Sequence, residues 1–427
     1  MSERKRIYLC LAHMSGAGLE QKYIKEAFDT NWVVPLGPNV NGFEKDLEEF
    51  VNENQNENEK LAKRVVALSS GTAAVHLALI NCGVKAGDEV CVQSFTFCAS
   101  SHPITYLGAT PVFIDSEKDA WNMDPDLLEE AIKDRIAKTG KKPKAIVPVA
   151  LYGMPYNVDR IMEIANRYDI PVVEDAAEGF GSRWKGQVLG TFGKYGVLSF
   201  NGNKMITTSG GGALVTANEE EWREIMMYAT QYRESYPYYQ HEKIGFNYRM
   251  SNICAGIGRG QMTVVNDHIA HHKHVQALYE ELLKDVKGIT VHAQPTTGEY
   301  DSNYWLCTIT LDENVRIKGQ ENAYKTIVQG AVGGAAGVIH VADSATTDCQ
   351  PNDNVEALRV FMDAAGIEAR PVWKPMHKQP VYKNCPAYVN GVSEAIFKVG
   401  MCLPAGPYVS EEDVHYIVDT IKSAIVA

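Results

Sequence analysis

The chain contains the stretch Ser199-Phe-Asn-Gly-Asn-Lys204-Met-Ile-Thr-Thr-Ser-Gly-Gly-Gly212, which places one lysine in a polar, glycine-rich turn after an apolar run. A neutral lysine amine is a nucleophile that forms Schiff bases with carbonyl groups, although most lysines are solvated surface charges. Upstream, the stretch Pro171-Val-Val-Glu-Asp175-Ala-Ala-Glu178 has the pattern of a buried strand that ends in acids. Open α/β sheets bind their ligands at the carboxyl ends of strands. Together the two stretches predict an α/β fold with a functional site at such an edge.

Runs typical of strands alternate with runs typical of helices between Leu61 and Thr216. Several of the strand runs are short and continuously apolar, as expected where helices cover both faces of a mainly parallel sheet. We therefore expect a large α/β domain. The predicted strands are 65–68, 89–93, 111–114, 144–150, 172–173, 196–200 and 213–216, and the predicted helices include 71–82 and 158–168.

A chain of 427 residues is long enough for two domains that share a cleft. Two helices separated by a fixed loop over 31–38 are expected between Glu20 and Phe50, and a long helical pattern runs from about Asn252 to Leu283. We predict a large domain over 1–265, with its N-terminal arm, and a small α+β domain over 266–427 with an insertion at about 314–355. The polar stretch 52–60 is expected to be a solvated loop or a frayed helix end.

The composition excludes several classes of protein. Hydrophobic residues make up 45% and charged residues 22%, which is typical of an ordinary globular protein, and no apolar window nears the length of a membrane span. With no signal-peptide pattern either, a cytoplasmic location is expected. The nine cysteines are odd in number and form no Cys-x-x-Cys pair, so we expect reduced thiols. The net charge of -12 argues against general binding of nucleic acid.

Pyridoxal phosphate (PLP) needs an amine for its aldehyde, an acid for its ring nitrogen, donors for its phosphate and packing for its ring. Lys204 is the candidate amine and Asp175 the candidate acid. A carboxylate at the ring nitrogen keeps that nitrogen protonated, which lets the ring accept electrons. The alternative for Asp175 is the N-cap of a helix after a strand.

The run Ser70-Gly71-Thr72 is typical of a tight turn at the start of a helix, where free N–H groups and the helix dipole bind phosphate. Such a run is more often a simple cap. Ser199 could donate to the same phosphate from a neighbouring strand end. Phe97 follows another strand and could lie over the cofactor ring, or it could belong to the core.

The chain resembles the DegT/StrS-type sugar aminotransferases over roughly residues 13–422, apart from 314–355. The blocks that carry the resemblance are Pro35-Leu-Gly, Ser70-Gly-Thr-Ala-Ala, Gly108-Ala-Thr-Pro-Val-Phe-Ile-Asp115, Glu174-Asp-Ala-Ala, Ser199 to Lys204 with Ile206-Thr-Thr, Asn247-Tyr-Arg-Met-Ser-Asn252, Arg370-Pro-Val-Trp373 and Leu403-Pro-Ala-Gly406. The resemblance implies PLP-dependent transferase fold type I, with a seven-stranded sheet in the large domain.

The same resemblance implies roles for individual residues. Lys204 would hold the cofactor, Asp175 would meet its ring nitrogen and Phe97 would stack on it. Glu178 would contact the ring hydroxyl, at a position where the family often has Gln or His. Asn247 would reach the cofactor phosphate of a second subunit, so the active unit would be a homodimer. The remaining phosphate contacts would come from Gly71, Thr72 and Ser199.

Two features of the lysine segment bear on the reaction. Family members that dehydrate their sugar carry His in place of this lysine, so Lys204 favours transamination. Where the family commonly has Thr-Gly-Glu-Gly-Gly, this chain has Thr208-Ser-Gly-Gly-Gly212. This form of the segment, together with Phe200 to Lys204 and Tyr248 to Asn252, is most similar to the family members of the UDP-N-acetylbacillosamine pathway. Those enzymes aminate C4 of UDP-linked N-acetyl keto sugars.

The resemblance thus implies transfer of an amino group from L-glutamate to a nucleotide-linked 4-keto sugar for glycan biosynthesis, with the cofactor alternating between PLP and pyridoxamine phosphate (PMP). A nucleoside diphosphate needs cationic or N–H donors and a flat partner for its base. The candidate substrate-binding residues are Asn31, Trp32, Arg249, Arg370, Trp373 and His377. For Arg249 a structural ion pair is the alternative, and Trp305 is expected in the core.

Three other interpretations stay open. A GDP-linked 4-keto sugar or a 3-keto sugar could be the substrate, and a PLP-binding regulator without catalysis is the rival from another class.

Four histidines on one predicted helix invite a metal site, but only Asp267 could complete a set, so no metal is expected. They are His268, His271, His272 and His274. The tyrosine-rich segment 232–239 is expected to be a mobile loop or a dimer surface.

Overall fold

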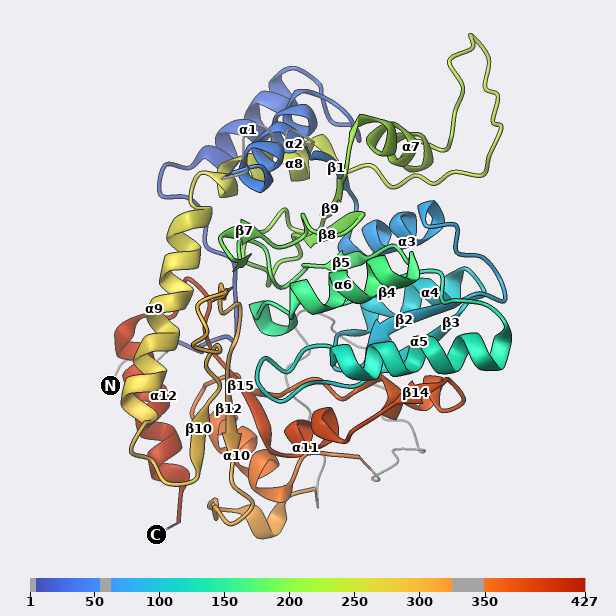
Figure 1. The fold of residues 1–427 in the computed structure, drawn as a ribbon. Helices are drawn as coiled ribbons and strands as arrows, with labels where there is room; N and C mark the ends of the chain where they lie inside the picture. Colours follow the sequence, from blue (N-terminus) through green and yellow to red (C-terminus); the bar gives the residue numbers. More distant parts are fainter. Residues whose placement is uncertain (1–4, 54–62, 325–348, 427) are drawn as a thin grey trace.

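The structure is a computed structural model that describes residues 5–53, 63–324 and 349–426 (Figure 1). Most of the predicted polar stretch 52–60 lies outside the described residues. The same holds for residues 325–348, the centre of the predicted insertion. Among the described residues, no helix is both long enough and apolar enough to cross a bilayer.

A mainly parallel sheet lies at the centre of the larger part of the molecule (Figure 1). The sheet consists of two four-stranded ladders, β1-β9-β8-β5 and β14-β3-β2-β4. Two parallel bridges join them, one between Ile146 and Val172 and one between Val149 and Asp175. β9 is antiparallel to both of its neighbours. The strands are β1 (Arg64–Leu68), β2 (Glu89–Gln93), β3 (Thr110–Ile114), β4 (Ile146–Val147), β5 (Val173–Asp175), β8 (Tyr195–Ser199), β9 (Gly212–Thr216) and β14 (Ala387–Tyr388).

Among the described residues, the sheet contains the seven strands expected from the N-terminal half, and β14 extends it with a strand from the C-terminal part. The predicted fold class is therefore confirmed. Strand β4 is much shorter than the predicted strand 144–150. Its apolar neighbours are buried but do not belong to the strand. The prediction was too long because a continuous apolar run indicates burial and not hydrogen bonding.

Helices cover both faces of this sheet, and β1 shows why. Its side chains alternate between two cores, with Val65 and Ala67 in one and Val66 and Leu68 in the other. The first core also receives residues of α2, α5 and α6, and the second receives residues of α3, α4 and α7. These helices are α2 (Pro38–Val51), α3 (Gly71–Asn81), α4 (His102–Tyr106), α5 (Pro125–Thr139), α6 (Val158–Tyr168) and α7 (Glu219–Ala229).

The long helix expected from Asn252 to Leu283 is wrong in one respect, because it is two helices. α8 (Asn252–Met262) packs on α1 (Leu19–Asp29) and α2, and α9 (Val265–Leu283) runs down the side of the molecule (Figure 1). At the break, the N–H groups of Thr263 and Val264 bond to carbonyls only three residues back, and the Thr263 hydroxyl also donates to the Gly260 carbonyl. A β-branched residue with such a side-chain bond ends a regular helix readily.

The C-terminal part has an antiparallel sheet in the order β10-β12-β15-β13 and a core of its own. Helix α9 contributes to both cores, Val265 and Ile269 to the first and Val275 and Tyr279 to the second. The division at residue 265 therefore stays a prediction. The elements here are β10 (Ile289–Val291), β12 (Cys307–Leu311), α10 (Asp353–Ala364), β13 (Arg370–Pro371), α11 (Val392–Val399), β15 (Gly400–Leu403) and α12 (Glu411–Ala424). A small sheet of β6 (Arg183–Trp184), β7 (Gln187–Val188) and β11 (Tyr300–Asp301) links the two parts.

One carboxylate anchors the end of β5 that carries the predicted acids. Glu174 is 1% exposed and accepts hydrogen bonds from the N–H groups of Gly190 at 2.9 Å, Phe192 at 2.6 Å and Gly193 at 2.6 Å. Burial raises the pKa of this carboxyl, against the effect of those three backbone bonds. Because neighbouring side chains of a strand point to opposite faces, Glu174 holds the loop before β8 while Asp175 faces away from it.

We expect Glu174→Ala to lower the free energy of unfolding by about 3 kcal/mol or more, because buried N–H groups lose their acceptor. Glu174→Gln keeps one acceptor oxygen and should lose less. The exposed Glu220 is the matched control, and its replacement by Ala should change stability by no more than about 0.5 kcal/mol. Urea unfolding followed by fluorescence measures all three, and equal midpoints for Glu174→Ala and Glu220→Ala would contradict the assignment.

Candidate active site

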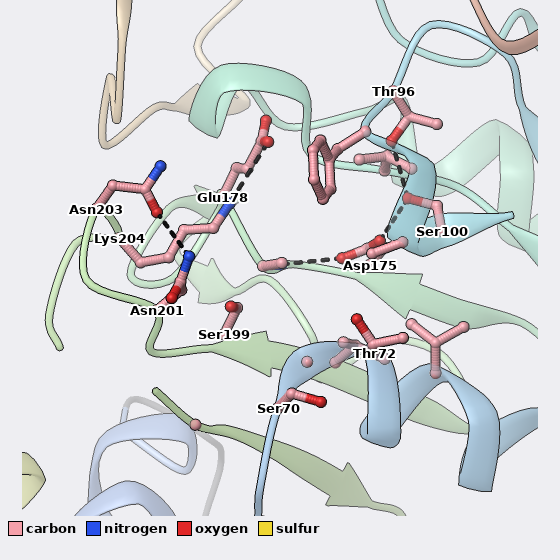
Figure 2. A pocket seen from close by; sticks show the side chains of 18 of the residues that line it. Ser70, Thr72, Thr96, Ser100, Asp175, Glu178, Ser199, Asn201, Asn203 and Lys204 are labelled. Carbon is pink, nitrogen blue, oxygen red and sulfur yellow. Dashed lines mark hydrogen bonds and ion pairs between the residues drawn. The ribbon is translucent and has the colours of Figure 1, made fainter. Parts of the chain in front are cut away.

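A pocket of about 390 Å³ opens where β1, β5 and β8 end (Figure 2). It brings together segments that are far apart in the sequence, from the turn before α3 to the C-terminal part. The residues that line it include Ser69, Ser70, Gly71, Thr72, Thr96, Phe97, Ser100, Asp175, Ala177, Glu178, Ser199, Asn201, Asn203, Lys204, Gly210, Gly211, Trp305 and Trp373.

Lys204 lines this pocket, and its side chain is only 12% exposed. Its Nζ is 3.5 Å from Oε1 of Glu178 (Figure 2). The same atom lies 4.0 Å from the ring centroid of Trp305. The backbone N–H of Lys204 donates to the Asn201 carbonyl at 2.9 Å, which closes the turn after β8. The amine is thus held between a carboxylate and an aromatic face at the pocket wall.

Glu178 is almost completely buried beside this amine. Its other oxygen, Oε2, accepts from the backbone N–H of Tyr152 at 2.8 Å. Burial raises the pKa of the Glu178 carboxyl and the charge of Lys204 opposes that rise. Tyr152 adopts φ 54°, in the left-handed region that is unfavourable for a bulky residue, so its N–H is aimed at Glu178 at the cost of local strain.

Asp175 forms the floor of the pocket and is 5% exposed. Its Oδ2 accepts from the Ser100 hydroxyl at 2.6 Å and its Oδ1 from the Ala177 N–H at 3.2 Å. Burial raises the pKa of the Asp175 carboxyl, and the bond from Ser100 is the first of the effects that lower it. The alternative expectation, a helix N-cap, is wrong because turns rather than a helix follow β5.

The opposite end of the pocket is built from the start of α3 and the end of β8. Ser70 caps α3 by accepting from the Ala73 N–H at 3.0 Å, which leaves Gly71 and Thr72 in the first turn beside the pocket. A Cβ atom added to Gly71 would lie 3.1 Å from Cβ of Ser199. The glycine therefore lets a helix start and a strand end form one cradle, and such a cradle suits a phosphate.

Two aromatic side chains form a further wall. The rings of Phe97 and Trp373 lie 5.3 Å apart, and Phe97 remains 48% exposed, so it is not a core residue. The Trp373 backbone N–H donates to the Tyr152 hydroxyl at 2.7 Å, and its indole Nε1 is buried with no partner among the described residues. Trp373 comes from the C-terminal part of the chain, so both parts of the molecule enclose the pocket.

The residues present fit PLP. The cradle offers a helix start and a hydroxyl for the phosphate, Asp175 offers a carboxylate for a protonated ring nitrogen, Lys204 offers the amine, and Phe97 offers a flat face. The roles of these side chains remain predictions, but the structure gathers the residues predicted from separate motifs around one cavity.

Several predicted substrate residues lie away from this pocket in the described chain. Arg249 is paired with Glu44 at 2.5 Å and donates to the Ala67 carbonyl, which is the structural ion pair that was its alternative. The exposed Asn31 and the 39% exposed Trp32 do not line the pocket. Asn247 is exposed and also lies outside the lining.

Two residues predicted near the C-terminal end are engaged elsewhere. Arg370 pairs with Glu368 at 2.8 Å. His377 contacts the Ser94 hydroxyl through Nδ1 at 2.7 Å, and burial lowers the pKa of its imidazole. Neither residue is among those that line the pocket.

Two histidines of α9, His268 and His272, are buried in packing positions. Nδ1 of His268 is 3.2 Å from the Met205 carbonyl, and Nδ1 of His272 is 3.1 Å from the Tyr304 carbonyl. A carbonyl only accepts, so each of these ring nitrogens donates. Burial lowers the pKa of His272 to about 3. Within the described segments, no three His, Cys, Asp or Glu side chains gather as metal ligands would.

Some of the lining residues were not predicted from the sequence. Ser100 donates to Asp175 and Thr96 bonds to Ser100, and both residues follow β2 in the same run as the predicted Phe97. Trp305, expected only in the core, is 2% exposed yet lines the pocket, where its Nε1 donates to the Asn203 carbonyl at 2.6 Å. A tryptophan far along the sequence carries no local signal of that placement.

Known proteins are similar to this chain in sequence and fold. EpsN of Bacillus subtilis, described as a candidate pyridoxal phosphate-dependent aminotransferase, is 40% identical over 98% of this chain and 95% of its own length. The GDP-perosamine synthase of Caulobacter vibrioides is 32% identical over the full length of both chains. The crystal structure of a DegT DnrJ EryC1 StrS aminotransferase from Brucella abortus has a TM-score of 0.78 and 26% identity, covering 96% of this chain and 99% of that one.

The profile of the DegT/DnrJ/EryC1/StrS aminotransferase family matches residues 15–329 and 338–422. Aminotransferases of this family bind PLP, which agrees with the fit of the pocket. The family profile covers most of the sequence, and so do the alignments with the two relatives of more than 30% identity. This chain belongs to the DegT/DnrJ/EryC1/StrS aminotransferase family and is a PLP-dependent enzyme.

Proposed function

We propose that this enzyme transfers an amino group from L-glutamate to the C4 ketone of a UDP-linked 4-keto-6-deoxy-N-acetyl-hexose, giving a UDP-4-amino-4,6-dideoxy sugar. The observation that carries the aminotransferase chemistry is the buried amine of Lys204, held 3.5 Å from Glu178 in a pocket with Asp175 at its floor. The bacillosamine-type substrate is supported by the segment Ser209–Gly212 that follows this lysine.

PLP, when bound, supplies an electron-accepting ring that stabilises the carbanion formed when a proton leaves the carbon bearing the amino group. Lys204 is placed to move that proton, because its Nζ lines the pocket and general acid–base groups act at hydrogen-bonding distance. The carboxylate of Glu178 holds the amine on this side of the cavity. Asp175 would keep a positive charge on the ring nitrogen.

The mouth of the pocket suits an uncharged sugar ring. Gly210 and Gly211 line it together with the amide side chains of Asn201 and Asn203. Nothing lies within 4 Å of the position that a Cβ atom would take at Gly210, so this glycine leaves room for a hexose to approach the lysine. An amide group donates to and accepts from sugar hydroxyls. These neutral groups agree with a sugar at the reacting end and with its phosphates farther out.

A GDP-linked 4-keto sugar is the second candidate substrate. Its support is the relative from Caulobacter vibrioides, named GDP-perosamine synthase, which is similar over the full length of this chain. In both candidates the ketone at C4 is aminated. The difference lies in the nucleotide and in the substituent at C2 of the sugar.

We further propose that the active unit is a homodimer in which Asn247 completes the pocket of the partner subunit. Asn247 is exposed and lies outside the pocket of its own chain. The exposed tyrosines of the segment after α7, which extends away from the body of the molecule, offer a surface for that partner (Figure 1). They are Tyr236, Tyr238 and Tyr239.

We expect Lys204→Ala to lower kcat by about 10²–10⁴-fold, the usual contribution of a general acid–base group. Lys204→Arg should fail as well, because a guanidinium keeps its proton. Borohydride treatment of the wild type should fix the cofactor on the peptide that contains Lys204, as peptide mass spectrometry would show. The surface variant Lys185→Ala is the control, and labelling of any other lysine would contradict the assignment.

A panel of UDP- and GDP-linked 4-keto and 3-keto sugars, each with glutamate, tests the substrate. We expect the UDP-linked 4-keto-6-deoxy-N-acetyl-hexose to show the highest kcat/KM and to yield a 4-amino sugar by mass and proton NMR spectra. Discrimination of about 10-fold or more is expected wherever a polar contact is lost. Preferential amination of the GDP-linked sugar would select the second candidate, and amination only at C3 would reject both.

Mixing inactive chains tests the shared pocket. If Asn247 acts across the dimer, Lys204→Ala and Asn247→Ala chains unfolded and refolded together should regain about one quarter of wild-type activity, because half of the dimers are mixed and each has one intact pocket. Each variant refolded alone is the control. No recovery in mixed dimers isolated by two affinity tags would show that Asn247 serves its own chain.

A further inference from the structure

A chain of hydroxyl groups leads from the turn after β2 to Asp175 (Figure 2). The Thr96 and Ser100 oxygens are 2.8 Å apart, and the Ser100 oxygen is 2.6 Å from Oδ2 of Asp175. Thr96 is 1% exposed, Ser100 2% and Asp175 5%, so water hardly competes for these bonds. Neither hydroxyl has a role in the chemistry described above.

The direction of each bond in this chain follows from the number of hydrogens. An ionised carboxylate only accepts, so Ser100 donates its single hydroxyl hydrogen to Asp175. Ser100 then has no hydrogen for Thr96, and Thr96 must donate to Ser100. Thr96 thereby fixes the rotation of the Ser100 hydroxyl, and Ser100 in turn fixes the carboxylate.

The second oxygen of Asp175 has a fixed partner too, the N–H of Ala177 at 3.2 Å. Donors at both oxygens define the plane of the carboxylate, which lines the pocket. The charged groups that act on Asp175 are Lys204 and Glu178, which both lie across the pocket. A buried carboxylate with few donors tends to take up a proton, and hydrogen bonds to its charged form oppose this.

We propose that Ser100, oriented by Thr96, is a positioning residue that fixes the Asp175 carboxylate for contact with the ring nitrogen of PLP. This inference rests on the proposed role of Asp175. The same turn carries Phe97, which also lines the pocket. One short segment therefore sets both the face on which the cofactor ring packs and the carboxylate that meets its nitrogen.

The test compares PLP affinity, measured by absorbance titration of apoprotein, among Ser100→Ala, Thr96→Val and the double variant. Hydrogen bonds to charged groups are strong, so Ser100→Ala should weaken PLP binding roughly ten-fold and Thr96→Val by less. Because Thr96 acts through Ser100, the double variant should bind like Ser100→Ala alone. Additive losses would indicate two separate packing effects and would overturn the proposal.

The pH dependence of PLP binding gives a second readout. Loss of the Ser100 bond raises the pKa of Asp175, so the carboxylate takes up a proton at a higher pH during acidification. The acid limb of the binding profile should therefore move to higher pH in Ser100→Ala. The matched control is Ser101→Ala, since the neighbouring Ser101 is equally buried and donates instead to the Cys98 carbonyl. An unmoved limb in Ser100→Ala would overturn the proposal.

Asp175→Asn separates this inference from the proposed function. If Asp175→Asn binds PLP as the wild type does, the proposed role of Asp175 fails, and the inference fails with it. If Asp175→Asn binds weakly while Ser100→Ala equals Ser101→Ala, the role of Asp175 stands and the positioning role of Ser100 is wrong. Far-ultraviolet circular dichroism verifies the fold of every variant.

Discussion

The desolvation of two carboxylates beside one amine is the constraint on which the structure around the pocket depends. Asp175 and Glu178 are both almost completely buried, and burial raises the pKa of each. Buried charges are tolerated only where partners are close and well oriented. Lys204, Ser100 and the N–H of Tyr152 supply those partners, and each comes from a different strand end.

Much of the surrounding fold serves to bring these partners into place. Glu174 holds the loop before β8 through three backbone bonds, which sets the path of the strand that leads to Lys204. Tyr152 has a positive φ, and its backbone N–H donates to Glu178. Its hydroxyl accepts from the backbone N–H of Trp373. The C-terminal part is thereby tied to the large sheet at the pocket, and Trp305 and Trp373 complete its walls.

The fold was predictable to a large extent because local pattern and burial agree over most elements. The alternation of apolar and helical runs indicated β1 to β5, β8 and β9, whereas the short strands β6 and β7 were not predicted. The break between α8 and α9 escaped prediction because the apolar pattern continues through Thr263 and Val264. The shortness of β4 escaped for a similar reason, since burial and ladder formation leave the same apolar signature.

The sequence by itself determined the α/β class, the family and the group of motif residues that surround the pocket, because Gly71, Asp175 and Lys204 each sit at a turn with a recognisable local pattern. Only the tertiary structure decided which polar side chains are bonded to which. Arg249 is paired with Glu44, and Ser100 donates to Asp175, through contacts between segments far apart in the chain. Such contacts depend on how strands and loops pack in space, and neither residue type nor spacing along the chain encodes that packing.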